Sequence, residues 1–200
     1  LASSKHILDI HKTFYYNLPE KLQKKLAVEN STELRFKDSG AGIVAASSAD
    51  RGGLRSFSVY KLHISEYAFA DNPEELKATA IAALNDGQLV MESTANYYND
   101  ALHQEILKTQ RGLASWKYIF FPWFQHKKYK QPVPKRIKWE PTDTDEELRS
   151  RHDLNDQQLY WRYLQIQKIG LDKFSREYPE TLEDAYKQTG NSYFSQKDLE

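Results

Sequence analysis

Two residues at the end of an apolar stretch are the first candidates for chemistry. The segment VYKLHISEYAF, residues 59–69, passes from strand-like apolar residues to Ser65 and Glu66. A carboxylate at the end of a buried strand is costly unless it faces a cleft or a cation. Such an acid could orient or deprotonate the water that attacks a nucleotide phosphate. Taken alone, the stretch favours the simpler interpretation of an acid in solvent at a strand end.

Further groups suited to phosphate chemistry flank this stretch. Arg51 and Arg55 precede it on a glycine-bearing loop, and Ser93 and Thr94 follow the next apolar stretch. Ligands bind in such folds at the edge formed by the carboxyl ends of parallel strands. An acid, a cationic loop and two hydroxyls at one edge would suit phosphoryl transfer. The residues alone favour a surface arginine at Arg55, and a strand-end cap at Ser93 could coexist with function.

The elements that must position these groups follow from apolar spacing and turn residues. Helical spacing is found at 3–16, 73–84 and 99–110, and turns are predicted at 39–42 and 85–87. The predicted strands are 32–38 and 43–48, which form a hairpin, and 58–65, 88–94 and 116–122. Because strands and helices alternate from residue 58 onwards, the pattern predicts an α/β fold with a mostly parallel sheet.

The character of the chain changes after Pro134. Two residue pairs have the spacing of a capping box, Thr144 with Glu147 and Asn155 with Gln158. The predicted helices in this part are 156–169, which ends at Gly170, and a short one over 181–187. We therefore expect a small helical subdomain over 140–190.

Four segments together resemble the large terminase subunit of tailed bacteriophages. They are GLRSFSVYKLHISEYAF (53–69), LNDGQLVMESTAN (84–96), WKYIFFPWFQHKKY (116–129) and FSREYPETLEDAYKQTGNSYF (174–194). The resemblance covers most of the chain from about residue 30, and the order of the four segments makes it more specific than any one motif. It implies the ATPase of a DNA-packaging motor, with an additional-strand P-loop fold, followed by a helical linker.

The resemblance also implies roles for individual residues. Glu66 matches the catalytic glutamate, and Ser65 stands where an acid of the Walker B motif is usual, so it could hold Mg²⁺ only weakly, through water. Arg55 best matches an arginine finger that acts on a neighbour's ATP, and Arg51 is the second candidate. Ser93 and Thr94 match the motif that couples hydrolysis to movement. ATP and Mg²⁺ are the cofactors that the family implies for the full-length protein.

The expected organisation is that of the middle of a terminase. It comprises a partial ATPase core at 1–139, a linker subdomain at 140–190 and the start of an RNase H-like nuclease at 191–200. The sequence contains no G-x-x-x-x-G-K-[ST] motif, so we expect the chain alone to bind ATP poorly. The family implies double-stranded DNA, neighbouring subunits, the portal and the small terminase as partners. It also implies the host cytoplasm during virion assembly as the location.

A basic and aromatic stretch at 117–139 is a second candidate for binding. It contains seven Lys or Arg and no acidic residue. Five of its cations could either contact nucleic acid or a neighbouring subunit or belong to a solvated loop. They are Lys127, Lys128, Lys130, Lys135 and Arg136. For Trp123 and Phe124 the pattern favours packing in a core. His126 has no second histidine or acid at metal-ligand spacing.

Composition limits the remaining classes. The 28 basic and 28 acidic residues balance, so net charge indicates no partner and any basic surface must be local. There is no cysteine, which excludes disulfides and thiolate metal sites. No apolar run has the length of a membrane span, and we expect a soluble, cytosolic protein. A non-catalytic α/β module that binds nucleic acid or a protein remains the alternative to the motor ATPase.

Overall fold

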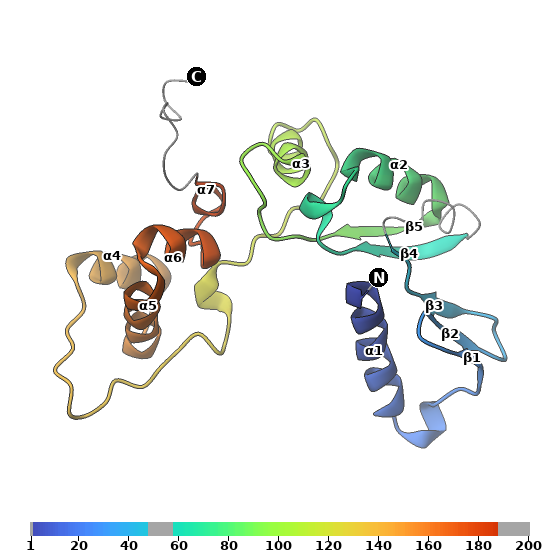
Figure 1. The fold of residues 1–200 in the computed structure, drawn as a ribbon, viewed down its shortest axis with the longest axis horizontal. Helices are drawn as coiled ribbons and strands as arrows, with labels where there is room; N and C mark the ends of the chain where they lie inside the picture. The colour runs from blue at the N-terminus through green and yellow to red at the C-terminus, as the bar shows by residue number, and fades with distance from the viewer. Residues whose placement is uncertain (1, 48–57, 188–200) are drawn as a thin grey trace. The chain divides into compact units, whose positions relative to one another are not determined.

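A computed structural model of the chain describes residues 2–47 and 58–187. The chain divides between Ser93 and Thr94 into two units, drawn in Figure 1. The expected division into 1–139, 140–190 and 191–200 stays a prediction, and its last segment lies outside the described residues. Arg51 and Arg55 also lie outside them.

The first unit begins with a helix and a small antiparallel sheet. Helix α1 (Ala2–Tyr16) confirms the predicted helix, and a 3-10 turn, η1 (Glu20–Leu22), follows Pro19. The sheet has the order β1-β2-β3, with bounds Leu26–Glu29, Glu33–Phe36 and Gly42–Val44. The predicted hairpin is thus confirmed as β2 and β3, whereas β1 is an addition. Its four residues are too few to show a period in the sequence.

A parallel β-α-β unit completes the first unit. It consists of β4 (Val59–Ile64), α2 (Pro73–Ala83) and β5 (Leu84–Met91), and Figure 1 shows α2 lying beside the two strands. The strands pair in parallel, as predicted, with Ile64 opposite Met91. Helix α2 begins where expected, because the Asn72 side chain accepts a hydrogen bond from the Glu75 backbone and Pro73 suits the first turn.

The predicted turn at 85–87 instead forms an irregularity inside β5. Val59 is opposite Leu84 but Lys61 is opposite Gln88, so the pairing shifts register across these residues. A Cβ atom at Gly87 would lie 2.2 Å from the carbonyl oxygen of Tyr60. Only glycine allows this approach of the two backbones. Turn-forming residues therefore mark a bulge here, and β5 starts earlier than predicted.

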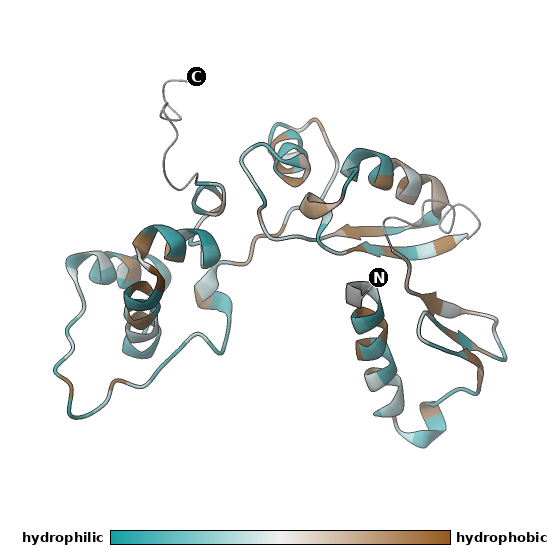
Figure 2. Ribbon diagram, in the orientation of Figure 1, coloured by the Kyte–Doolittle hydropathy of each residue, from teal (hydrophilic) through white to brown (hydrophobic). Residues whose placement is uncertain are grey.

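The second unit, from Thr94, is helical. Its elements are α3 (Ala101–Gln110), η4 (Trp123–Gln125), α4 (Asp143–His152), α5 (Asp156–Ile169), α6 (Leu171–Glu177) and α7 (Leu182–Ala185). Figure 2 shows apolar turns on α5, while the segment between η4 and α4 is mostly hydrophilic. No helix in the described ranges has the length and apolar character that crossing a membrane requires.

The predicted strand over 116–122 is wrong. No residue of this segment pairs in either sheet of the described ranges. Its side chains alternate between partly buried and exposed, as they do on an extended chain. Alternation indicates extended backbone but does not supply a neighbouring strand. Here the indole nitrogen of Trp116 donates to Glu105 of α3 at 2.9 Å, so a helix anchors the start of the segment.

The caps of α4 and α5 test the two predicted capping boxes. The pair Asn155 and Gln158 is confirmed at the start of α5. The pair at residues 144 and 147 is wrong, because Thr142 and Asp145 form the box and α4 begins two residues earlier. Asp145 is 3% exposed and receives a hydrogen bond from Arg162 at 2.7 Å. That buried partner selects the earlier cap, and it lies on a helix distant in sequence.

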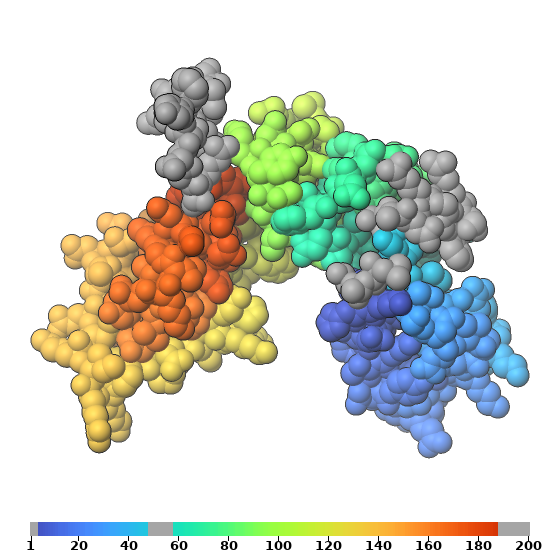
Figure 3. All heavy atoms as spheres, in the orientation of Figure 1, coloured from blue at the N-terminus to red at the C-terminus, as the bar shows by residue number. Residues whose placement is uncertain are grey.

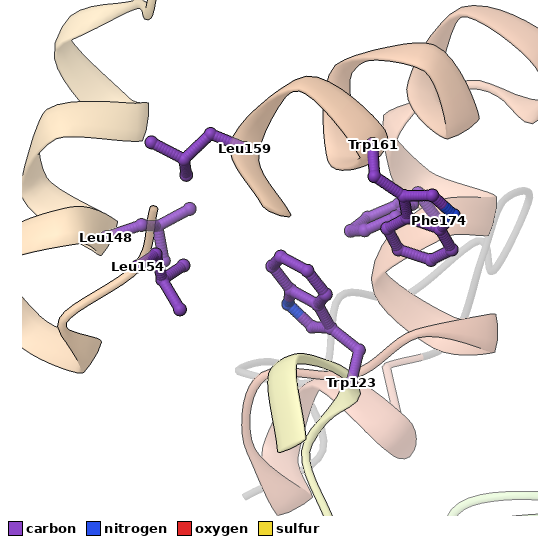
Figure 4. Packing of buried hydrophobic residues seen from close by; sticks show 6 residues of the cluster. All are labelled: Trp123, Leu148, Leu154, Leu159, Trp161 and Phe174. Carbon is purple, nitrogen blue, oxygen red and sulfur yellow. The ribbon is translucent and has the colours of Figure 1, made fainter. Parts of the chain in front are cut away.

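An aromatic core holds the second unit together. The cluster in Figure 4 joins η4 to α4, α5 and α6 through Trp123, Leu148, Leu154, Leu159, Trp161 and Phe174. The rings of Trp123 and Trp161 stack with centroids 5.5 Å apart. Trp123 is 4% exposed and Phe124 packs against the cluster, which confirms that these two aromatics belong to a core.

Candidate functional site

The carboxyl end of β4 turns sharply at Glu66. This residue has φ 55° and ψ 45°, the left-handed conformation, and its side chain is exposed. The next residue, Tyr67, begins the 3-10 turn η3 (Tyr67–Phe69) and is fully buried. Its backbone nitrogen donates to the carbonyl of Glu92, 3.0 Å away, just beyond β5. The strained turn therefore points Glu66 to solvent while Tyr67 fixes the strand end in the core.

Ser93 links the ends of the two parallel strands. Its Oγ donates to Oε2 of Glu66 at 3.3 Å and accepts from the backbone N–H of Ala68 at 3.2 Å. The backbone N–H of Glu92 also donates to the carbonyl of Ile64, at 3.0 Å. The structure thus brings Glu66 and Ser93 together at the predicted sheet edge, because parallel strands end on the same side.

The other predicted residues of this edge are less closely connected. Ser65 is partly buried and Thr94 is exposed, and neither side chain makes a hydrogen bond in the part of the chain that the structure describes. The roles expected of Arg51 and Arg55 fall on residues outside the described ranges. Among the residues predicted for this edge, the contact that the structure shows is therefore the one between Glu66 and Ser93.

Sequence reasoning missed a second carboxylate at this edge. Glu92 follows β5 directly, and its Oε1 lies 3.4 Å from Nε2 of His63, a residue of β4. Both side chains are about half exposed. The signal was the position of Glu92, which lies in the predicted strand 88–94 directly after the apolar residues 89–91, as Ser65 follows Ile64 in the predicted strand 58–65.

A buried polar cluster in the second unit was also missed. Asp100 is 1% exposed, and its Oδ2 accepts from the backbone nitrogen of Asn96 at 3.0 Å. Its Oδ1 accepts from the backbone nitrogen of His103 at 2.8 Å and from the hydroxyl of Tyr186 at 3.4 Å. Asp100 thereby caps α3 and ties it to Tyr186, just beyond α7. The helix predicted over 99–110 included Asp100, although an aspartate near a helix start is the usual sign of such a cap.

Burial sets the protonation of this cluster. Burial lowers the pKa of His103, and the negative charges of Asp100 and Glu183 oppose that shift only in part. The ring stacks on Tyr186 with centroids 4.1 Å apart, and its Nδ1 accepts from the backbone nitrogen of Asn99 at 3.0 Å. Burial, followed by the Asp100 carboxylate, raises the pKa of Tyr186. His103 is thus held neutral beside a neutral phenol.

The basic residues predicted for binding lie on the segment between η4 and α4. This group is exposed throughout and consists of Lys127, Lys128, Lys130, Lys135 and Arg136. The structure does not bring these cations to Glu66 or Ser93 within one unit, since they belong to the second unit and the acid belongs to the first. They are therefore a candidate surface of the second unit.

Some of the groups that a nucleotide site would use are present among these residues and others are absent. No group of three or more His, Cys, Asp or Glu side chains in the described ranges could hold a metal ion. The Ser65 hydroxyl suits an indirect contact through water, since Mg²⁺ keeps several of its waters. None of the eight glycines precedes a lysine, so these 200 residues lack the phosphate cradle. In comparisons with known proteins, no family model and no curated protein matches this chain.

Proposed function

We propose that this chain is the ATPase core and linker region of a large terminase subunit, which drives viral DNA into a procapsid. The observation that carries the proposal is the contact between Glu66 and Ser93 at the carboxyl edge of a parallel β-α-β unit. That edge is where α/β sheets bind ligands. A lone acid at a strand end is common, but an acid that is hydrogen-bonded to a hydroxyl just beyond the neighbouring parallel strand is held in position.

Glu66 is the proposed base. Its exposed carboxylate accepts the proton of the water that attacks the terminal phosphate of ATP. Bound Mg²⁺ would neutralise charge on the phosphates, with Ser65 near its waters. Ser93 holds the carboxylate through its Oγ and is itself held by the Ala68 backbone, so a movement of the segment after β5 reaches Glu66 directly. That link is the proposed coupling, with Thr94 as the next residue of the segment.

The rest of the motor follows from the family resemblance. Arg55, or Arg51 in its place, would stabilise charge on the phosphate in a neighbouring subunit. A P-loop would come from outside these residues, and a nuclease would follow the linker. Double-stranded DNA, the portal and the small terminase would be partners. The rival proposal is a non-catalytic binding module, which needs none of the chemistry at Glu66.

The decisive experiment changes Glu66 in a complete protein that contains this chain and a P-loop. Glu66→Gln should keep ATP binding and abolish hydrolysis, because an amide cannot accept the proton. Ser93→Ala should lower turnover by up to about 10²-fold, the effect of a misplaced catalytic group. Glu20→Gln, an exposed acid in the same unit, is the matched control and should change neither quantity. Turnover is measured by phosphate release, and binding by a fluorescent ATP analogue.

The same measurements distinguish the rival. If Glu66→Gln hydrolyses ATP at the wild-type rate, Glu66 is a structural acid and the proposal is wrong. If the complete protein neither binds nor hydrolyses ATP, the binding module is favoured. A variant with Arg55→Ala should lose only the hydrolysis that assembly stimulates, because a finger acts on the transition state in a neighbouring site.

A further inference from the structure

The segment between η4 and α4, residues 126–142, is a long loop with concentrated positive charge. It has no helix or strand, and it carries six Lys or Arg residues against a single acid, Glu140. In the space-filling view of Figure 3, the yellow to light-orange segment forms a protrusion on the second unit. Like charges repel one another, so such a loop needs an anchor to keep its course.

Aromatic side chains of the loop provide the anchor. Tyr129 stacks on Trp161 of α5 with centroids 4.4 Å apart and an interplanar angle of 6°. Trp139 lies against Tyr160 with centroids 5.3 Å apart. Between these two points, the backbone nitrogen of Gln131 donates to the carbonyl of Gln157 at 2.9 Å. Both ends of the basic loop are therefore held to α5.

The cations of the loop remain available. Lys127, Lys128, Lys130, Lys135 and Arg136 are exposed, and their side chains make no ion pair or hydrogen bond within the described ranges. Lys138 is the exception, since its Nζ lies 3.1 Å from a carboxylate oxygen of Glu140. Exposed cations that are not paired with an acid attract a dense array of negative charge.

We propose that the loop at 126–142 is a docking surface for the phosphate backbone of a nucleic-acid duplex. The aromatic rings favour a duplex over a single strand, because Tyr129 and Trp139 are used in packing and cannot stack on bases. The exposed groups favour phosphates over a protein, whose interfaces have an apolar, charge-depleted centre. Naming the duplex as DNA rests on the proposed function, whereas the phosphate contact rests on the loop alone.

The test uses the 200-residue chain, without ATP, and a fluorescently labelled DNA duplex of mixed sequence. Binding is followed by anisotropy between about 50 and 200 mM salt, and log Kobs should fall linearly with log salt. The variant K127Q/K128Q/K130Q should bind more weakly, with a salt slope smaller by about one for each phosphate that the protein no longer neutralises. The variant K135Q/R136Q should likewise bind DNA more weakly and with a smaller salt slope than the wild type. K21Q/K24Q/K25Q removes three exposed cations of the first unit and should leave the slope unchanged.

Three results would overturn the inference. They are the absence of salt-dependent binding by the wild type, an unchanged slope in both loop variants, and tighter binding of a single strand with quenching of tryptophan fluorescence. Loss of self-association in the loop variants, without any effect on DNA, would identify a second copy of the chain as the partner instead. Near-ultraviolet circular dichroism checks that each variant keeps its aromatic packing. Because ATP is absent, these outcomes are independent of whether Glu66 supports hydrolysis.

Discussion

Glu66 has a left-handed backbone, which costs a non-glycine residue about 1–2 kcal/mol. Contacts of the neighbouring residues offset this conformational cost. Tyr67 is buried next to it, and Ser93 bonds both the Glu66 carboxylate and the Ala68 backbone. Strain that the neighbouring structure maintains is typical of functional sites. At the scale of single residues, the conformation and the hydrogen bond together distinguish Glu66 from an ordinary acid at a strand end.

His103 provides a prediction for the pH dependence of stability. Burial lowers its pKa in the folded state, so the unfolded state binds more protons as the pH falls. The stability contribution is fully present above the unfolded pKa of about 6.5 and is lost as the pH falls through the folded value. Protonation of His103 would also place an N–H group at Nδ1, facing the backbone N–H of Asn99, so the hydrogen bond between them would be lost. The free energy of unfolding should therefore fall as the pH drops below about 6.5.

Urea titrations at a series of pH values, followed by tryptophan fluorescence, measure this pH dependence of the free energy of unfolding. The four tryptophans all lie after Thr94 and therefore report on the second unit. His103→Gln should flatten the pH dependence. The exposed His6 lies in the first unit, and His6→Gln should keep the wild-type slope. An equally steep slope in His103→Gln would show that other groups titrate.

At the scale of elements, buried polar contacts define how the helices of the second unit begin. Asp145 at the start of α4 is bonded by Arg162 of α5, and both side chains are largely buried. The guanidinium carbon of Arg162 also lies 5.6 Å from the centre of the Phe174 ring in α6. One arginine therefore joins three helices. Removing one member of a buried ion pair leaves an unpaired charge, which is strongly destabilising.

We therefore expect Arg162→Ala to lower the unfolding free energy of the second unit by about 3–5 kcal/mol. Tryptophan fluorescence during urea denaturation gives the value. Lys168→Ala changes an exposed cation of the same helix and should stay within about 0.5 kcal/mol of the wild type. If Arg162→Ala lowers the free energy of unfolding by no more than the control does, Asp145 must be hydrogen-bonded by water or by another side chain in that variant.

At the scale of the whole molecule, the division between Ser93 and Thr94 predicts two cooperative units. Trp123→Ala should lower the unfolding free energy of the second unit by about 3–5 kcal/mol, because it opens a cavity in the aromatic core. Amide hydrogen exchange in β4 and β5 should not change. Conversely, Leu62→Ala should accelerate exchange in those strands and leave the tryptophan transition in place. A joint shift in both units after either change would contradict their independence.

Local patterns in the sequence were enough for several parts of the molecule. They predicted α1, α2 and α5, the β2–β3 hairpin, and the parallel pairing of β4 with β5. They also predicted that Glu66 and Ser93 lie at one edge. These features depend on apolar periodicity, on caps next to the helix and on the rule that connected parallel strands end on one side.

Other features depended on partners far away in the chain. The extended pattern at 116–122 was correct for the backbone and wrong for the sheet, because alternation cannot supply a strand to pair with. The cap of α4 moved to Thr142 because Arg162 binds Asp145. The buried state of Asp100 depends in part on Tyr186, 86 residues later. A local sequence window contains both the donor and the acceptor of a cap, but only tertiary packing decides which side chain from elsewhere reaches them.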